Sequence, residues 1–219
     1  MPDLSSSILQ ISIWALPTIF AIILHEVSHG VVALQLGDDT AQRAGRLTLN
    51  PIPHIDPIGT IILPALLILT HLPVFGYARP VPVDFRRLRN GRTGMMEVAA
   101  AGPLTNFALA FASALGLRFL SGMVYGPLAD DVVIPLANMF RASVLVNVML
   151  GIFNLVPLLP LDGGRVMVGL LPLAAARAYA QTERFGFMIL VLLLWMGWLN
   201  VIINPSIAFA LRVIQRVVL

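Results

Sequence analysis

Two histidines and a glutamate near the start of the chain have the spacing of a site for zinc-dependent hydrolysis. His25, Glu26 and His29 form the pattern His-Glu-x-x-His. Residues four apart on a helix share one face, about 5–6 Å apart, so the two imidazoles can bind one zinc ion. The carboxylate of Glu26 then stands beside the ion and can accept a proton from water. The sequence therefore predicts a metal centre that activates water.

The element that carries this motif has the composition of a membrane helix. No charged residue occurs between Ile8 and Leu24, and the apolar run continues from Val31 to Leu36. The whole chain is 58% hydrophobic and only 11% charged, whereas soluble domains have about 25% charged residues. We therefore expect an integral, multi-pass membrane protein in which residues 1–219 form one domain. Ionisable groups inside a membrane are costly and usually functional.

Charge and cysteine content exclude several other kinds of site. The net charge is +3, but the arginines lie in short loops beside apolar runs, where they orient membrane spans, and nucleic acid is not predicted as a partner. The chain has no cysteine, so a thiolate metal site and a thiol nucleophile are both excluded. Any metal must be bound by histidine and carboxylate side chains.

The remaining apolar segments predict an all-α polytopic fold with five to six transmembrane helices. The expected spans cover about residues 8–36, 58–72, 95–120, 132–154 and 185–203, with Pro205 interrupting the last. Residues 51–57 and 154–165 are too rich in proline for regular helix, and residues 47–50 could form a short strand. Irregular backbone at membrane depth must be buried in protein or line a wet cavity. We expect these re-entrant or β-like segments to surround the zinc site.

Five spans would place the N-terminus on the same side as the arginine-rich segment 79–92 and residues 165–184. That side would then hold eight arginines, against five that include Arg43 and Arg46 on the other side. The positive-inside rule then assigns the first side to the cytoplasm. One miscounted span would reverse the assignment.

A catalytic zinc ion needs a third protein ligand, and Asp162 is the best candidate. It lies between an apolar, proline-broken segment and two glycines, where a plain surface turn is not expected. The other histidines and carboxylates have simpler explanations as interfacial, solvated or helix-capping residues. These are His71, Asp38, Asp39, Glu97, Asp130 and Asp131.

Four segments in order give the chain a specific resemblance. They are residues 25–30 (HEVSHG), residues 45–60 (GRLTLNP to HIDPIGT), residues 101–106 (AGPLTN) and residues 154–164 (NLVPLLPLDGG). This combination resembles the site-2 protease family of intramembrane zinc metalloproteases, in a small bacterial or archaeal core form without a PDZ-like insertion. The matching segments cover most of the chain.

The resemblance implies a zinc endopeptidase of regulated intramembrane proteolysis. His25, His29 and Asp162 would bind one zinc ion, Glu26 would be the general base, and Asn154 would point toward the active site. The expected partners are single-span transmembrane substrates and the lipid bilayer, and the expected location is the inner membrane of a prokaryotic cell. The oligomeric state stays open.

Two further polar residues are assigned auxiliary roles, each with an alternative. Asn106 lies on a stripe of small and polar residues that otherwise indicates tight helix packing. His54 could line a water path, assist substrate entry or support a metal ligand, and it could equally be hydrogen-bonded within its proline-rich loop. The segment from Leu47 to Pro57 is predicted to expose an edge that pairs with an extended substrate by strand addition. A channel or carrier for divalent metal, using the same His/Asp site, is the alternative function.

Overall fold

The computed structural model describes residues 4–70, 76–123 and 129–218, and this part of the chain is helical without any β-strand. In chain order the elements are α1 (Leu4–Gln35), α2 (Thr40–Arg43), the 3-10 turn η1 (Ile52–His54), the π-helical turn η2 (Pro57–Ile62), α3 (Leu63–Leu69), α4 (Gly91–Ser121), the π-helical turn η3 (Ala129–Val133), α5 (Ile134–Asn154), α6 (Asp162–Leu170), α7 (Leu173–Ala180), α8 (Glu183–Trp195) and α9 (Trp198–Val218). The all-α class predicted from the sequence is confirmed.

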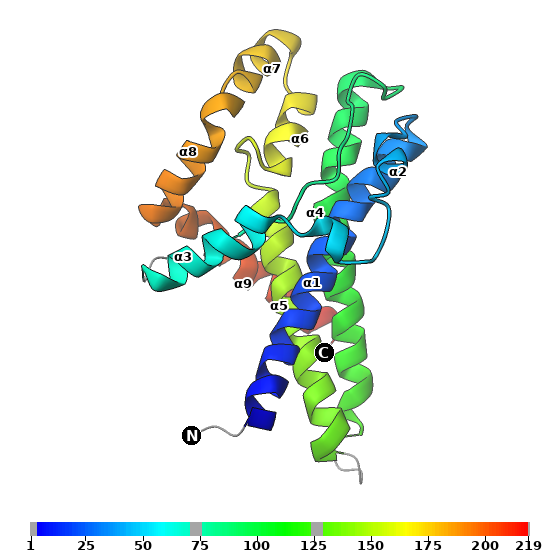
Figure 1. Ribbon diagram of the computed structural model, residues 1–219, viewed down its shortest axis with the longest axis vertical. Helices are drawn as coiled ribbons and strands as arrows, with labels where there is room; N and C mark the ends of the chain where they lie inside the picture. Colours follow the sequence, from blue (N-terminus) through cyan, green and yellow to red (C-terminus); the bar gives the residue numbers. More distant parts are fainter. Residues whose placement is uncertain (1–3, 71–75, 124–128, 219) are drawn as a thin grey trace.

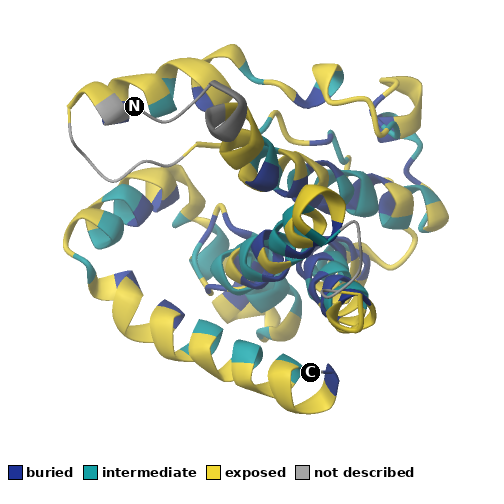
Figure 2. Cartoon of the chain, turned by 90° about the horizontal axis from the view of Figure 1, so that it is seen from below, coloured by how far each residue is buried: buried dark blue, intermediate teal, exposed yellow. Residues whose placement is uncertain are grey.

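Three long helices, α1, α4 and α5, run side by side and form the core of the molecule (Figure 1). Small side chains line their contacts, so the backbones approach closely, as is usual for helices packed inside membranes. Buried alanines at positions 21, 110, 114, 137 and 142 are of this kind. Seen from below in Figure 2, the central helices carry the buried positions, whereas α9, which ends at the C label, is largely exposed.

Four helices of the described chain are long and apolar enough to cross a membrane. They are Ile8–Gln35, Gly91–Ser121, Ala129–Asn154 and Trp198–Val218. The expected number of five to six is therefore approximate, because it also counted a segment around residues 58–72. That segment forms only a short apolar helix, Pro57–Leu67, and η2 and α3 project sideways from the bundle (Figure 1).

The last predicted span, residues 185–203, is divided in two. Gly197 has a φ of 73°, a left-handed conformation that ends helices and favours glycine. It separates the 13-residue α8 from the 21-residue α9. Pro205, which was expected to interrupt a helix, instead lies inside α9.

The strand predicted near residues 47–50 is absent, because local side-chain hydrogen bonds curl the backbone there. The hydroxyl oxygen of Thr48 accepts from the N–H of Asn50 at 3.1 Å. The side-chain oxygen of Asn50 in turn accepts from the N–H of Ile52 at 3.1 Å. Such turns compete with a strand ladder for the same backbone groups.

Residues 76–84, which we call the strap, form an irregular segment that is neither helix nor strand. The strap follows the edge of the loop that contains η1 and η2. The N–H of Tyr77 donates to the carbonyl of Gly59 at 3.1 Å, and the N–H of Arg79 donates to the carbonyl of His54 at 2.9 Å. The N–H groups of Tyr77 and Arg79 therefore face this loop, and the hydrogen-bonding groups of Ala78 between them face the other way.

The far end of the strap is held by a fully buried carboxylate, Asp38. It accepts from the N–H of Asp84 at 2.7 Å and from the N–H of Thr40 at 3.0 Å. Burial alone would raise the pKa of Asp38. The hydrogen bond from the Thr40 hydroxyl, the two backbone N–H groups and the nearby Arg87 outweigh burial and lower the pKa below its usual value. Asp38 therefore stays ionised and fixes the strap to the end of α1.

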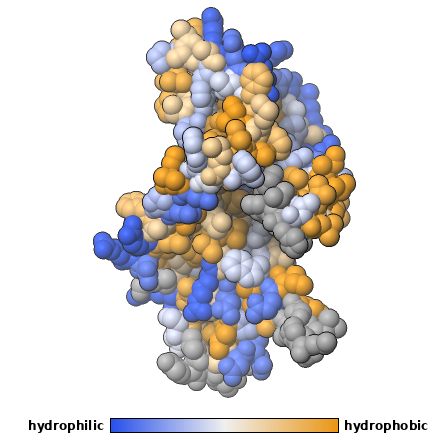
Figure 3. Space-filling view, turned by 90° about the vertical axis from the view of Figure 1, so that its left-hand side faces the viewer, coloured by the Kyte–Doolittle hydropathy of each residue, from blue (hydrophilic) through white to orange (hydrophobic). Residues whose placement is uncertain are grey.

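The arginines of the α2 region and those of segment 79–92 lie at one end of the bundle, and the sequence-based sidedness is wrong. Arg46 donates to the carbonyl of Arg79 at 2.6 Å, and Arg87 pairs with Asp39 at 2.6 Å. The α2 region and segment 79–92 therefore share one end, while the N-terminus lies at the other (Figure 1). The reason is that residues 58–69 do not cross the bundle. Figure 3 shows hydrophilic side chains at the upper end of the face it presents, whereas its lower part mixes apolar and hydrophilic patches.

Candidate metal centre

His25, Glu26 and His29 lie on α1 where this helix passes between α4 and the strap. The side chains of His25 and His29 are 8% and 11% exposed. Their Nε2 atoms are 3.2 Å apart, because a spacing of four residues stacks the two side chains on one face of the helix. Both rings therefore present the same type of nitrogen to a single point.

Asp162 reaches that point from α6, far along the sequence. Its Oδ2 atom is 3.1 Å from Nε2 of His25 and 3.4 Å from Nε2 of His29. Glycines after it allow this approach: a Cβ on Gly163 would lie 2.2 Å from the carbonyl oxygen of Leu155, and a Cβ on Gly164 would lie 2.5 Å from the N of Leu159. The double glycine therefore lets α6 begin directly against the loop that precedes it.

The orientation of the imidazoles shows that these three atoms suit a cation. Nδ1 of His25 is 2.6 Å from Oδ1 of Asn106, and Nδ1 of His29 is 2.7 Å from the carbonyl of Val98. Both Nδ1 atoms therefore carry the proton in neutral rings, and both Nε2 atoms present lone pairs. Two lone pairs facing the carboxylate of Asp162 would repel one another without a positive charge between them.

The separations between these atoms fit a tetrahedral zinc ion. Zinc bonds to nitrogen and oxygen of about 2.0–2.1 Å place two ligand atoms roughly 3.3 Å apart. The three observed separations are 3.1, 3.2 and 3.4 Å. Oδ2 of Asp162 is also buried without any other hydrogen-bond partner in the described chain. The donor set therefore fits zinc and leaves a fourth position for water or substrate.

A chain of buried side chains holds His25 in this orientation. Asn106 donates from Nδ2 to Oδ1 of Asn147 at 2.9 Å and to the carbonyl of Ala21 at 3.3 Å. Asn147 donates to the carbonyl of Ser143 at 2.9 Å. These bonds fix the amide of Asn106 so that its oxygen faces His25. Asn106 thus fixes the ring of a candidate metal ligand, and it does not line either of the two cavities that contain Glu26.

Gly102 of α4 lies directly against the two imidazole rings. A Cβ at this position would lie 2.6 Å from Nε2 of both His25 and His29. Only a glycine therefore allows the α4 backbone to pass so close to the metal-binding atoms. In the sequence, Gly102 lies four residues before Asn106, on the same stripe of small and polar residues, and that pattern gave no sign of this contact.

Glu26 lies beside this centre and lines a cavity of about 430 Å³ that contains both polar and apolar side chains. Its Oε2 atom accepts from the N–H of Val81 in the strap at 2.8 Å. The cavity is lined by both histidines, Asp162 and Asn154, with Arg165 and Phe85 at its edge. Arg165 stacks 5.0 Å from the centre of the Phe85 ring and pairs with Glu183 at 3.0 Å.

A second, more apolar cavity of about 500 Å³ shares the residues Glu26, Ala78 and Asn154. Its walls come from the strap on one side and from α5 and α8 on the other. The apolar wall residues are Leu150, Phe153, Phe187, Leu190 and Leu194. An apolar peptide therefore has room to reach the carboxylate of Glu26 from the side of α8.

The other sequence candidates lie apart from the three converging atoms. His54 is 3% exposed, its Nε2 is 3.0 Å from the carbonyl of Thr48, and it lines a separate cavity beside α1. Asn154 donates to the carbonyl of Leu150 at 3.0 Å and lines both cavities that contain Glu26. Of the other carboxylates considered above, Asp38 and Asp39 lie between α1 and α2, Glu97 lies inside α4, and Asp130 and Asp131 lie in η3. His71 lies outside the described residues.

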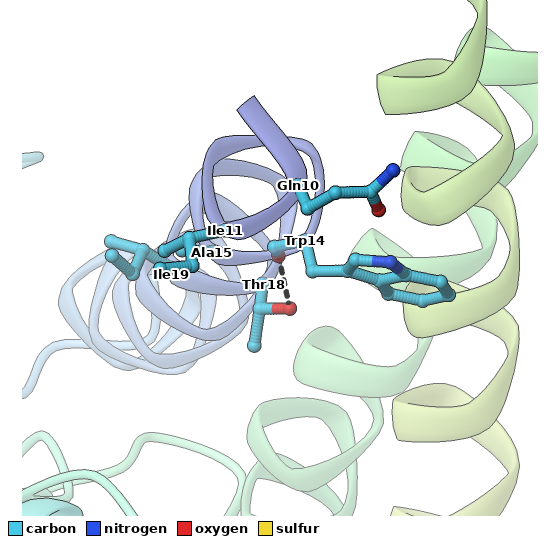
Figure 4. A pocket seen from close by; sticks show the side chains of 6 residues that line it. All are labelled: Gln10, Ile11, Trp14, Ala15, Thr18 and Ile19. Atoms are coloured by element: carbon cyan, nitrogen blue, oxygen red, sulfur yellow. Dashed lines mark hydrogen bonds between the residues drawn. The ribbon is translucent and has the colours of Figure 1, made fainter. Parts of the chain in front are cut away.

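A further pocket on α1 has no chemical groups for catalysis. Figure 4 shows its six residues, of which Gln10 and Trp14 point toward one side of the helix and Ile11 and Ile19 toward the other. The hydroxyl of Thr18 donates a hydrogen bond to the carbonyl of Trp14 at 2.7 Å. The pocket contains no ionisable side chain, so the metal centre is the better candidate for function.

Comparison with known proteins agrees with a zinc-dependent peptidase. The family model "Peptidase family M50" matches residues 120–197. The Bacillus subtilis protein "Putative zinc metalloprotease YwhC" is 38% identical over 178 residues, covering 78% of this chain and 74% of that protein. The Mycolicibacterium smegmatis protein "Putative zinc metalloprotease Rip2" is 29% identical over 193 residues, covering 83% of this chain and 66% of that protein.

No solved structure matches the chain. The chain belongs to peptidase family M50, the site-2 protease family. The family and the zinc cofactor inferred from the sequence are confirmed, and the four apolar helices identify the chain as an integral membrane protein.

Proposed function

We propose that this protein is an intramembrane zinc endopeptidase that hydrolyses peptide bonds in or near the transmembrane segments of membrane proteins. The observation that carries the proposal is the convergence of His25, His29 and Asp162, with Glu26 beside them, inside a bundle of membrane-spanning helices. Few other functions require a general base next to three metal-binding atoms.

In this proposal the three side chains hold one zinc ion. Zinc, when bound, polarises the scissile carbonyl and lowers the pKa of a water molecule to about 7. Glu26 takes the proton of that water and passes it to the leaving nitrogen as the C–N bond breaks. One water molecule is consumed, and one new carboxyl and one new amine group are released.

Asn154 and the strap are proposed to hold the substrate. Asn154 uses one side-chain N–H in α5 and has a second for a substrate carbonyl in the cavity. Ala78 has backbone groups without a partner in the described chain, next to the cavity of Glu26. An extended substrate can pair with this edge of the strap. Residues 47–50 are curled and offer no such edge. The substrate is therefore proposed to pair with the strap and not with residues 47–57.

We further propose that the arginine-rich end of the bundle faces the cytoplasm of a prokaryotic cell. The positive-inside rule supports this orientation, and both relatives described above are bacterial. The metal centre lies nearer this end, since α6 and the strap both reach it from there (Figure 1). Single-span membrane proteins are the proposed substrates.

Removal and return of zinc test this function in a defined system. Purified protein reconstituted in liposomes with a single-span membrane protein is expected to cleave it at a bond in or near the span, mapped by mass spectrometry. A zinc chelator should abolish cleavage, and added zinc should restore it. Liposomes without the protein are the control. Zinc flux across the bilayer without cleavage would instead support a metal carrier.

A further inference from the structure

We propose that the backbone amide of Val81 is the positioning group that orients Glu26 for proton transfer. This inference rests on the proposed function, because it assigns a role toward the proposed general base. The N of Val81 is 2.8 Å from Oε2 of Glu26. The other carboxylate oxygen of Glu26 has no hydrogen-bond partner in the described chain and is left to receive a proton.

The sequence around Val81 makes this amide the only backbone donor in its stretch of the strap. Pro80 and Pro82 flank it, and proline has no N–H. Each proline also restricts the residue before it to extended backbone. Residues 80–82 therefore form a stiff segment with one N–H group, and that group points at Glu26.

A glycine on α1, Gly30, leaves space for the side chain of Val81. Gly30 follows Glu26 by four residues and so lies on the same face of the helix. A Cβ on Gly30 would lie 2.9 Å from Cγ1 of Val81. The side chain of Val81 is 7% exposed, so it is seated against the glycine while its N–H contacts the carboxylate one turn earlier.

Contacts on both sides of Val81 hold the segment in place. Arg79 is bonded through its N–H to the carbonyl of His54, and its carbonyl accepts from Arg46 at 2.6 Å. Asp84 is bonded to the buried Asp38 at 2.7 Å. The amide is thus held from both directions without any help from Glu26. A carboxylate oriented by a fixed donor in a buried site needs no reorganisation when a proton is transferred.

Paired substitutions separate the amide from the side chain. Val81→Pro removes both the N–H and the valine side chain, whereas Val81→Ala removes only the side chain. We expect Val81→Pro to have a kcat about tenfold below that of Val81→Ala, with equal KM and equal zinc content. Val83 provides the matched control, because its N–H has no partner in the described chain. Val83→Pro and Val83→Ala should therefore have the same kcat as each other.

Amide hydrogen exchange tests the contact without any activity measurement. In the wild type the Val81 amide should be protected, and Glu26→Ala should increase its exchange rate at least about tenfold while leaving that of Val83 unchanged. This measurement also decides the matter if Val81→Pro does not fold. Equal exchange in both proteins, or equal kcat for the proline and alanine variants at position 81, would overturn the inference.

The experiments distinguish a failure of the endopeptidase function from a failure of the role proposed for Val81. If the wild type cleaves its substrate and position 81 behaves like position 83, only the role of Val81 is wrong. If the zinc-loaded wild type cleaves nothing, the endopeptidase function is wrong, and the exchange experiment still shows whether Val81 holds Glu26.

Discussion

Gly102→Ala is expected to abolish proteolysis and zinc binding, although it removes no zinc ligand. The added Cβ would lie 2.5 Å from Cε1 of His25 and 2.6 Å from Nε2 of both histidines. Neither ring can move away freely, because Asn106 holds His25 and the carbonyl of Val98 holds His29. We expect zinc affinity to fall by more than about 100-fold, measured by competition with a zinc chelator.

Gly122→Ala is the matched control for this prediction. A Cβ at Gly122 meets no atom within 4 Å, so this substitution should leave zinc content and cleavage at wild-type values. Wild-type zinc affinity in Gly102→Ala would show that the metal centre lies elsewhere or is much looser than the geometry indicates.

Asp162→Asn is expected to reduce zinc binding and cleavage about as strongly as Gly102→Ala. It acts by removing a negative charge, whereas Gly102→Ala acts by a steric clash. The amide keeps the shape of the carboxylate but loses its negative charge, and an amide oxygen is a weaker ligand for zinc beside two imidazoles. Zinc content measured by atomic absorption should fall well below one ion per chain, and cleavage should fall by at least about 10²-fold.

Asp130→Asn is the control for the loss of one carboxylate. Asp130 lies in η3, far along α5 from the metal centre, and its substitution should change neither zinc content nor cleavage. A fully zinc-loaded and active Asp162→Asn variant would exclude Asp162 as the third ligand.

The parts of the site that could be predicted are those with a fixed local spacing. His25 and His29 had to share a face because four residues make about one helical turn. Asp162 was distinguished by its surroundings, an apolar loop and two glycines that no ordinary surface turn requires. The structure brings these three side chains together, and their roles as ligands stay predictions until they are tested.

The parts that could not be predicted depend on contacts between distant segments. Gly102 has the sequence environment of a packing glycine, and only the crossing of α1 and α4 places it under the imidazoles. Val81 has no chemically active side chain, so its contact with Glu26 cannot be read from residue types. The pattern Pro80-x-Pro82 was the one available signal, since it predicts a stiff extended segment.

The fold predicted from the sequence was wrong where local sequence does not determine the direction in which a helix runs. Apolar residues 58–72 have the composition of a span, but Asp56 caps η2 through the N–H of Gly59 at 2.7 Å, and the short helix leaves the bundle sideways. That one segment reversed the predicted side of the N-terminus. The break at Gly197 was missed because its positive φ is a property of the folded chain.

Glu26→Gln tests the central claim most directly, with cleavage and zinc content measured on the same purified sample. Glutamine keeps the size of the side chain and can still accept the hydrogen bond from Val81, but it cannot take a proton from water. Zinc content is expected to equal that of the wild type, while cleavage of the single-span substrate falls by at least about 10²-fold. Cleavage at the wild-type rate by zinc-loaded Glu26→Gln would contradict the assignment of Glu26 as the general base of an intramembrane peptidase.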